Sequence, residues 1–482
     1  MRTRLERNPA KARTTWLTGA LVCSLATPAW AQQALTVEQL QQRLEALERL
    51  VGGTPPAEDG TGGEAGLADL DQRLRILERK LELQQEEQVA KAKEASVVTV
   101  NDKGASLKSA NGDYEIKLRG LVQGDARFFL DGVPTGTYDT FLLRTARPTL
   151  EGSLGKLVGF RLTPEFAGDS ASIVDAYVDL RFNPAYTLRV GKFTSPVGLE
   201  RLQSSAALSE IERALPSELA PNRDIGVQLQ GEVADSRVSY AVGVFNGAVD
   251  GRDAVTTNPD NDFEYAGRLF FEPFKSDANA LSGLGFGIGA SVGDKHGSGN
   301  NFLPRYRTPG QIQFFGYLAS VLADGRQTRF SPEGYYYRGG FGLLAEYIVS
   351  KQEVRVGAVR EDISNKAWQT TPSYVVSGED SGYRGVLKPS RPFDPGKGNW
   401  GAFELVGRYS VLEVDEDAFP LFANPSASAS QANSWTVGVN WYLNSNLKLV
   451  LNYLHTNFEG GAAAGADRES EKAVFSRLQV AF

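Results

Sequence analysis

The sequence predicts an all-β fold: a transmembrane antiparallel β-barrel of about 16 strands, preceded by a short periplasmic coiled-coil segment. Three observations predict it. Polar and apolar residues alternate in most segments after about residue 112, short turns alternate with long polar loops, and the chain ends in an alternating strand, Val474 to Phe482. Roughly 370 residues, at roughly 23 per strand with its connection, give the strand number.

The N-terminus has the pattern of a secretory leader over residues 1–31. Arg2, Arg4 and Arg7 begin a basic stretch, Trp16 to Ala26 is mostly apolar, and Ala29-Trp30-Ala31 is an Ala-x-Ala cleavage site. The only cysteine, Cys23, lies within this leader. We therefore expect a mature chain that starts near Gln32 and has no disulfide or thiol chemistry.

Residues 32–88 have helical periodicity. Apolar residues with spacings of three and four recur as Leu40, Leu44, Leu47 and Val51, and again as Leu67, Leu70, Leu74, Leu77 and Leu81. Spacings of this kind are typical of a coiled-coil seam, although one helical hairpin explains them too. A periplasmic coiled coil is our interpretation, and residues 89–112 are predicted to be a linker.

The remaining residues, 113–482, change to a period of two. In Ser172 to Phe182, for example, Asp175, Tyr177 and Asp179 alternate with apolar residues. Short turns at 183–185 and 444–446 alternate with long loops such as 246–262 and 377–399. This asymmetry is typical of outer-membrane barrels, which have short periplasmic turns and long external loops.

The side of each strand opposite its apolar, lipid-facing side should face the lumen. This rule predicts inward cations at Lys117, Arg119, Arg127, Arg161, Arg181, Arg189, Arg268, Arg408, Lys448 and Arg477. Arg144 and Arg147 have opposite parity, so either a bulge intervenes or one of them leaves the lumen. For any single arginine, the alternative is a solvated wall residue paired with a carboxylate.

The charge balance opposes a strongly anion-trapping lumen. From Asn111 onward, 25 Arg and 11 Lys stand against 43 acidic residues. Many acids fall in predicted external loops, but Glu115, Asp175, Asp179 and Glu404 are predicted to face inward beside the arginines. A wall of mixed charge creates a transverse field as readily as an anion site.

Several blocks of the sequence resemble the phosphate-selective porin O and P family. They include Val190-Gly191-Lys192-Phe193, Glu212-Arg213-Ala214-Leu215-Pro216 and Trp400 to Ser410, and the resemblance covers roughly residues 112 to 482. It implies a 16-stranded trimeric channel in the outer membrane of a Gram-negative bacterium, with arginines and lysines along an anion path. It also implies that Phe482 is an assembly signal.

The resemblance further implies a constriction loop that folds into the lumen, for which Leu199 to Asn222 is the candidate. Lys192, Arg201 and Arg213 are then expected near the narrowest point. Ser204 to Leu215 is predicted to form a short helix, with Leu208, Ile211 and Leu215 on one side. The alternative for Glu212 and Arg213 is that they only fix the loop to the wall.

These observations predict passive diffusion of small anions, with phosphate or polyphosphate as the candidate solute. The expected partners are outer-membrane lipids and two further copies of the chain. The alternative is a structural or receptor-like barrel with a coiled-coil tether. Gly289-Ala290-Ser291-Val292-Gly293 fits a hydrolase motif but lies in an alternating strand, and the chain has two histidines. We expect no enzyme activity, no cofactor, no metal centre and no nucleic-acid partner.

Overall fold

The computed structural model describes residues 42, 72, 74–87, 96–134, 137–275, 277–386 and 388–482. The chain divides into two units, Met1–Lys93 and Glu94–Phe482. In the first unit residues 74–87 are helical, Leu74 is buried, and Leu77 and Leu81 are half-buried. No helix among the described residues is long and apolar enough to span a membrane. The predicted leader lies outside the described residues, and the coiled coil stays a prediction.

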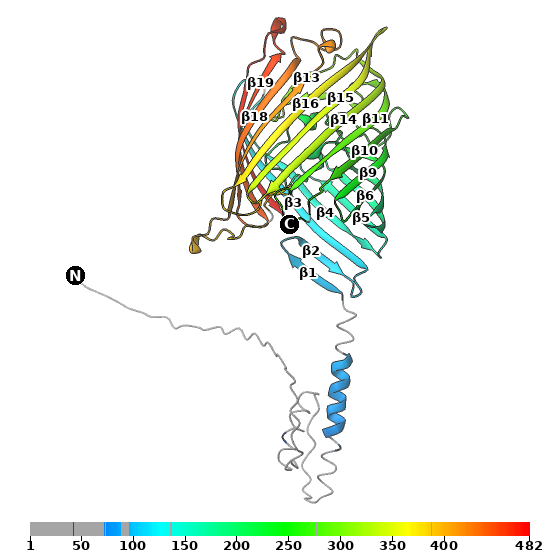
Figure 1. Cartoon of the computed structure of the whole chain (residues 1–482), viewed down its shortest axis with the longest axis vertical. Helices are drawn as coiled ribbons and strands as arrows, with labels where there is room; N and C mark the ends of the chain where they lie inside the picture. The colour runs from blue at the N-terminus through cyan, green and yellow to red at the C-terminus, as the bar shows by residue number, and fades with distance from the viewer. Residues whose placement is uncertain are drawn as a thin grey trace, which may run out of the picture. The chain divides into compact units, whose positions relative to one another are not determined.

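The described part of the second unit contains sixteen strands that form one closed antiparallel sheet, as predicted (Figure 1). The barrel closes where the last strand pairs with the first, with Val480 opposite Val122. The strands are β3 (Tyr114–Asp131), β4 (Thr140–Leu154), β5 (Val158–Glu165), β6 (Ser172–Asn183), β7 (Tyr186–Thr194), β8 (Arg223–Val233), β9 (Val238–Phe245), β10 (Glu264–Phe271), β11 (Leu284–Ser298), β14 (Leu322–Arg338), β15 (Phe341–Val356), β16 (Val359–Val375), β17 (Ala402–Glu413), β18 (Ala429–Tyr442), β19 (Leu447–Gly460) and β20 (Glu471–Ala481).

A hairpin extends this sheet within residues 89–112, where the sequence predicts only a linker. Strand β1 (Val97–Asn101) pairs with β2 (Gly104–Lys108), and β2 pairs with the first residues of β3. The Val97–Val100 run consists of three valines and one threonine and is too short to show a clear period of two, which is why the alternation rule misses it. The sheet therefore begins before residue 113.

The alternation of side chains follows the predicted parity in the closing strand. Phe475 and Arg477 are buried on the lumen side of β20, whereas Leu478 is 48% exposed on the outer side. At the chain end, the Phe482 backbone exchanges two hydrogen bonds with Gly120. A Cβ atom at Gly120 would lie 2.4 Å from the Phe482 ring, so only glycine fits beneath this aromatic side chain.

A bulge resolves the parity conflict between Arg144 and Arg147. The β3–β4 register shifts between Gln123 and Gly124, which leaves Arg144 as the extra residue of β4. Arg144 then contacts Glu212 of the β7–β8 loop, while Arg147 contacts Glu165. Both side chains therefore face inward, the first of the two outcomes that the sequence allows.

The two rims of the barrel differ from the prediction at one connection. Successive strands run in opposite directions, so the β16–β17 connection (376–401) emerges at the rim that carries the C-terminus and the 443–446 turn (Figure 1). It is therefore not on the same rim as the 246–262 loop, although its length suggests an external loop. Counting strands decides the rim of a connection, whereas length does not.

Loops from the opposite rim fill much of the lumen. The β7–β8 loop contains α3 (Leu199–Leu202) and η1 (Leu215–Glu218), and the β11–β14 loop contains η2 (Gly299–Asn301), β12 (Arg305–Arg307) and β13 (Gln313–Gly316). The shorter elements η3 (Pro395–Lys397), η4 (Glu416–Ala418) and η5 (Ala463–Gly465) lie in other connections. Leu215, Tyr306, Phe315 and Phe422 of these loops share one buried cluster with inward residues of the strands.

The helix predicted at Ser204 to Leu215 does not form. The helical turns lie on either side, at α3 and η1, and residues 204–214 are turns and irregular backbone. Leu208, Ile211 and Leu215 are nevertheless buried. Much of the polar backbone of this segment is hydrogen-bonded to strand side chains, which explains how irregular backbone is tolerated there.

Candidate functional site: a loop-divided lumen

The β7–β8 loop crosses the lumen and is bound by the far wall. Its backbone carbonyls accept hydrogen bonds from Lys448, Asn440 and Arg477 at 2.9, 2.8 and 2.8 Å, and its Ile211 amide donates to Asn452 at 2.8 Å. These side chains belong to β18, β19 and β20, far around the barrel from β7 and β8. The loop therefore closes the β15–β20 side of the lumen at this depth.

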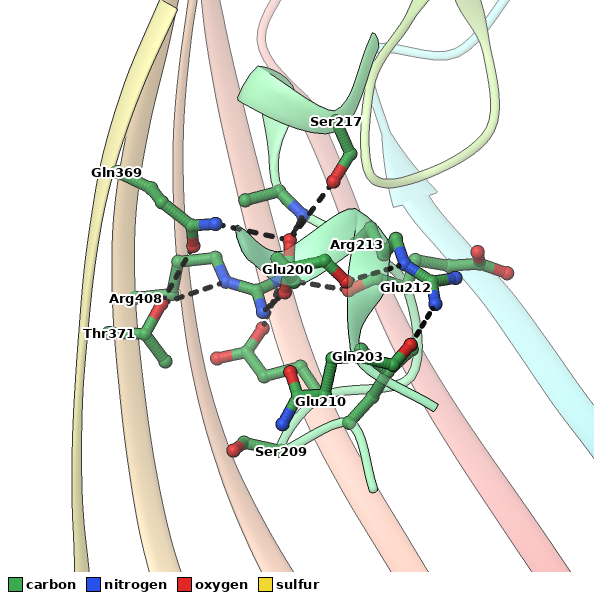
Figure 2. Close-up of polar contacts among 12 residues, drawn as sticks. Glu200, Gln203, Ser209, Glu210, Glu212, Arg213, Ser217, Gln369, Thr371 and Arg408 are labelled. Atoms are coloured by element: carbon green, nitrogen blue, oxygen red, sulfur yellow. Dashed lines mark hydrogen bonds and ion pairs between the residues drawn. The ribbon is translucent and has the colours of Figure 1, made fainter. Parts of the chain in front are cut away.

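One anchor of the loop is the Glu200 carboxylate of α3, shown in Figure 2 between Arg408, Gln369 and Ser217. It pairs with Arg408 of β17, which also donates to the Glu212 carbonyl at 2.7 Å. The Glu346 carboxylate of β15 accepts the Leu199 amide at 2.7 Å. Because Glu200 and Arg408 are each 2% exposed as side chains, this is a fully desolvated ion pair.

A second anchor is Glu212, which lies among three arginines of the wall. Its carboxylate is 2.5 Å from Arg127, 3.1 Å from Arg144 and 4.0 Å from Arg477. Burial alone would raise the pKa of Glu212, but the positive charge of these arginines outweighs burial and holds the pKa well below its usual range. Glu212 is thus an ionised link between loop and wall.

The Arg213 guanidinium is also committed to the loop. It donates to the backbone carbonyls of Glu200 and Gln203 at 3.1 and 2.7 Å. Burial, reinforced by the neighbouring charge of Arg201, lowers the pKa of Arg213 to about 9. Arg213 therefore shapes the loop backbone, and the groups that it contacts here belong to the loop and not to the barrel wall.

The connection at the C-terminal rim contacts the same loop from below. The Tyr383 hydroxyl donates to the Leu199 carbonyl at 2.5 Å, and the Gln203 amide donates to the Tyr383 carbonyl at 2.6 Å. Val386 packs with inward residues Val375, Ala402 and Tyr442. Part of the β16–β17 connection therefore lies inside the barrel mouth, on the side that the β7–β8 loop already fills.

The β3–β10 side of the lumen is not filled between the β7–β8 loop and the C-terminal rim. A cavity of about 850 Å³ lies there, bounded by loop residues Arg201 to Ala206 and extending to Pro184, Gly231 and Phe482 at the C-terminal rim. We call it the rim cavity. Seven arginines line it, from six strands and the loop: Arg119, Arg147, Arg161, Arg189, Arg201, Arg223 and Arg268. Its other lining side chains are mainly hydroxyls, amides and aromatic rings.

Most of these arginines are paired with carboxylates of their own wall. The pairs are Arg119–Glu151 (2.8 Å), Arg161–Glu151 (2.8 Å), Arg147–Glu165 (2.6 Å), Arg189–Asp179 (2.8 Å), Arg223–Asp175 (3.4 Å) and Arg268–Glu333 (2.5 Å). Arg189 also stacks on Tyr177, 3.8 Å from the ring centroid. Among the lining arginines, Arg201 alone has no carboxylate within ion-pair distance among the described residues.

Arg201 is distinctive in its remaining contacts. Its side chain donates to the Ser217 carbonyl, and its buried Nε has no hydrogen-bond partner in the described structure. Burial, opposed by the charge of Glu218, lowers the pKa of Arg201 below its ordinary value. A lumen-lining guanidinium with a spare donor and no carboxylate within ion-pair distance is suited to an anion.

The thirteen cations predicted from the sequence fall into three groups. Those that line the rim cavity are Arg119, Arg161, Arg189, Arg201 and Arg268. Those bonded to the β7–β8 loop or within it are Arg127, Arg213, Arg408, Lys448 and Arg477. The remaining three are ion-paired elsewhere: Lys117 with Glu115, Arg181 with Asp179 and Lys192 with Asp253.

Two cavity-lining arginines are missing from the predicted set. Arg147 has the opposite parity to Arg144, so the sequence leaves open whether it faces inward, and the bulge at Arg144 lets both face the lumen. Arg223 opens β8 directly after the loop, where its alternation with later residues is hard to recognise. Among the described residues, no three His, Cys, Asp or Glu side chains are grouped so that they could hold a metal ion.

Comparison with known proteins agrees with this architecture. The family model described as phosphate-selective porin O and P matches residues 116–482. Porin O of Pseudomonas aeruginosa is 24% identical over 426 residues, which cover 80% of this chain and 93% of that protein. A protein of Caulobacter vibrioides is also 24% identical, over 390 residues that cover 77% of this chain and 74% of that protein.

Among solved structures, the outer membrane channel DcaP of Acinetobacter baumannii has a similar fold. It aligns with a TM-score of 0.51 at 13% identity, over 78% of this chain and 99% of DcaP. Sequence match, strand number and barrel closure lead to one conclusion. The chain belongs to the phosphate-selective porin O and P family and is an outer-membrane porin, a channel rather than an enzyme.

Proposed function

We propose that the protein lets small anions, with inorganic phosphate or polyphosphate as candidate solutes, diffuse passively through the open β3–β10 side of its lumen. The main observation in favour of the proposal is the rim cavity. Seven arginines line it, six from the strands and one from the lumen-crossing loop. Fixed positive charge in a narrow lumen favours anion entry over cation entry. The β7–β8 loop acts as the constriction.

The ion pairs indicate a moderate selectivity. Six of the seven lining arginines have a wall carboxylate within 3.4 Å, which reduces the net positive charge that a passing ion meets. Arg201 is the lining arginine without a directly paired carboxylate in the described structure, so its charge is the least compensated of the seven. Binding must be weak enough for release if a channel is to conduct, so partial compensation suits passage better than tight capture.

Membership of the porin family and the position of the C-terminus suggest how the barrel is oriented in the outer membrane. In this proposal the rim with Phe482 and the β1–β2 hairpin faces the periplasm, together with residues 32–88. The arginine-lined cavity is then the periplasmic half of the path, and the acidic loops lie outside. Three copies would form the working porin, with the helical segment as a candidate site of self-association.

Reversal potentials of the purified protein in planar bilayers test the proposal. In a KCl gradient the expected sign is that of an anion-preferring channel, and added phosphate should reduce the chloride current. A cation-preferring sign would refute the proposal. Absence of any ion current would instead support the structural or receptor-like alternative.

A further inference from the structure

A polar pocket of about 380 Å³ lies in the β16–β17 connection, away from the rim cavity. Its lining side chains are two hydroxyls, one carboxylate, one guanidinium, one amide and one indole: Ser377, Ser390, Glu379, Arg391, Asn399 and Trp400. We call it the rim pocket. The rim pocket thus offers a cation, an anion and an aromatic surface in a single small volume.

The carboxylate of the rim pocket is held in place as a fixed negative charge. Glu379 accepts hydrogen bonds from the Ser377 hydroxyl at 2.5 Å and from the Ser390 hydroxyl and amide at 2.7 and 3.0 Å. Partial burial alone would raise the pKa of Glu379, but these hydrogen bonds lower it. Glu379 is therefore ionised at neutral pH.

The guanidinium of the pocket is free to bind a ligand. Arg391 is exposed and forms no hydrogen bond or ion pair through its side chain within the described part of the chain. Its neighbour Lys397 is exposed too, but it is paired with Asp394 at 2.7 Å. Arg391 is thus the cation that lines the rim pocket, it is unpaired in the described structure, and its planar fork is suited to a phosphate.

Aromatic side chains place the pocket at the level of the membrane surface. Trp400 is 58% exposed, and its carbonyl accepts a 2.6 Å hydrogen bond from the indole of Trp441. Trp441 stacks on Phe403, its cross-strand neighbour on the outer face, with ring centroids 5.5 Å apart. Tryptophan and phenylalanine at the end of the outer wall are typical of the interfacial girdle of a membrane barrel.

We propose that the rim pocket binds the headgroup of a zwitterionic phospholipid from the adjacent membrane leaflet, with Arg391 on the phosphate and Glu379 on the ammonium group. The charges of the pocket match both charges of such a headgroup. Trp400 lies where the glycerol and upper acyl chain would begin. The inference concerns lipid recognition at the rim and does not depend on which ion the lumen passes.

Native mass spectrometry of the full-length protein in detergent, with phosphatidylethanolamine (PE) or phosphatidylglycerol (PG) of matched acyl chains, tests this assignment. The wild type should bind PE about tenfold more tightly than PG, as expected for one charge-assisted hydrogen bond to Glu379. Glu379→Gln should abolish this preference, and Arg391→Gln should weaken binding of both lipids about tenfold. Lys397→Gln, the matched control, should bind like the wild type.

Each contrary result is distinct. Equal binding of the two lipids by the wild type, or a preference that Glu379→Gln leaves intact, would overturn the proposal. Equal competition by soluble glycerophosphoethanolamine would show that the ligand is a free zwitterion rather than a membrane lipid. Single-channel conductance of all variants should equal that of the wild type, which separates this test from that of anion passage.

Discussion

The two sides of the lumen contain the same residue types in different states. On the β3–β10 side, arginines such as Arg161 and Arg189 line an open cavity and pair with carboxylates of their own wall. On the β15–β20 side, Arg408 and Arg477 are 5% and 4% exposed and bond to the β7–β8 loop. An inward arginine is therefore not necessarily a residue of the ion path.

The physical cause is the cost of an isolated charge. A guanidinium removed from water requires a partner, and the loop provides carboxylates and carbonyls where it crosses the lumen. Where no loop crosses, water solvates the arginine and a wall carboxylate completes its pairing. We therefore expect mutations on the two sides to affect different properties, stability on one and selectivity on the other.

The largest effect is expected from Arg408→Gln, which leaves the buried Glu200 and Glu210 carboxylates without their cation. Breaking a buried ion pair typically costs about 3–5 kcal/mol, so the unfolding free energy should fall by that order. Heat-induced unfolding in detergent, followed by tryptophan fluorescence, measures it. Arg119→Gln is the control and should cost under about 1 kcal/mol, because Arg119 is partly exposed and Glu151 keeps Arg161. Similar losses of unfolding free energy in both variants would show that the arginines of the two sides do not differ in their contribution to stability.

The next effect concerns selectivity. The double variant Arg161→Gln/Arg189→Gln should lower the anion-to-cation permeability ratio by up to about fivefold for each charge removed. This factor corresponds to the interaction energy of roughly 1 kcal/mol between two unit charges 4 Å apart in water. The reversal potential in a KCl gradient reports the ratio. Lys448→Gln removes a cation from the loop-filled side, where its ammonium donates to the Leu208 carbonyl. If Lys448→Gln lowered the ratio as much as the double variant, the assigned path would be wrong.

A smaller effect is expected from pH. The Glu210 carboxylate is 3% exposed, its Oε1 has no partner in the described structure, and its Oε2 is 3.5 Å from Arg408. Burial, with the charge of Glu200 added, raises the pKa of Glu210 to about 7. Because the pKa of Glu210 is higher in the docked loop than in water, the docked state loses stability as the pH rises from about 4.5 to about 7. The loss in free energy is about 1.4 kcal/mol per pH unit.

Single-channel recordings check this dependence. The open-channel current of the wild type should be noisier at pH 8 than at pH 5, because the ionised Glu210 repels Glu200 within the docked loop. Glu210→Gln should be equally quiet at both values. Noise in Glu210→Gln that still rises with pH would show that another group controls the loop.

The strand architecture could be predicted because alternation is a local property. The parity of Phe475, Arg477 and Leu478 determines which face each side chain occupies, and it is correct for the closing strand. The opposite parities of Arg144 and Arg147 narrow the possibilities to a bulge or the loss of one side chain from the lumen, and the structure has the bulge. The rim predicted for the β16–β17 connection is wrong, although a count of strands from either end places it correctly.

The division of the lumen could not be predicted from a single sequence. Arg408 and Glu200 are 208 residues apart, and no local pattern links them. Parity places Arg408 and Arg161 equally inside the barrel, but only the path of the loop decides which is covered. Arg147 is missed for a related reason, because its direction depends on one inserted residue in a neighbouring part of β4.

The most direct test of the divided lumen is a pair of single cysteines placed on its two sides. Thr187 lines the rim cavity, whereas Ser410 of β17 is fully buried on the loop-filled side. Thr187→Cys and Ser410→Cys are close in size to the native residues, and Cys23, the chain's only cysteine, is exchanged for serine in both. A sulfonate-bearing thiol reagent should modify Thr187→Cys and reduce its current, while Ser410→Cys stays unmodified. Rapid modification of Ser410→Cys with Thr187→Cys unreactive would show that the lumen is not divided in this way.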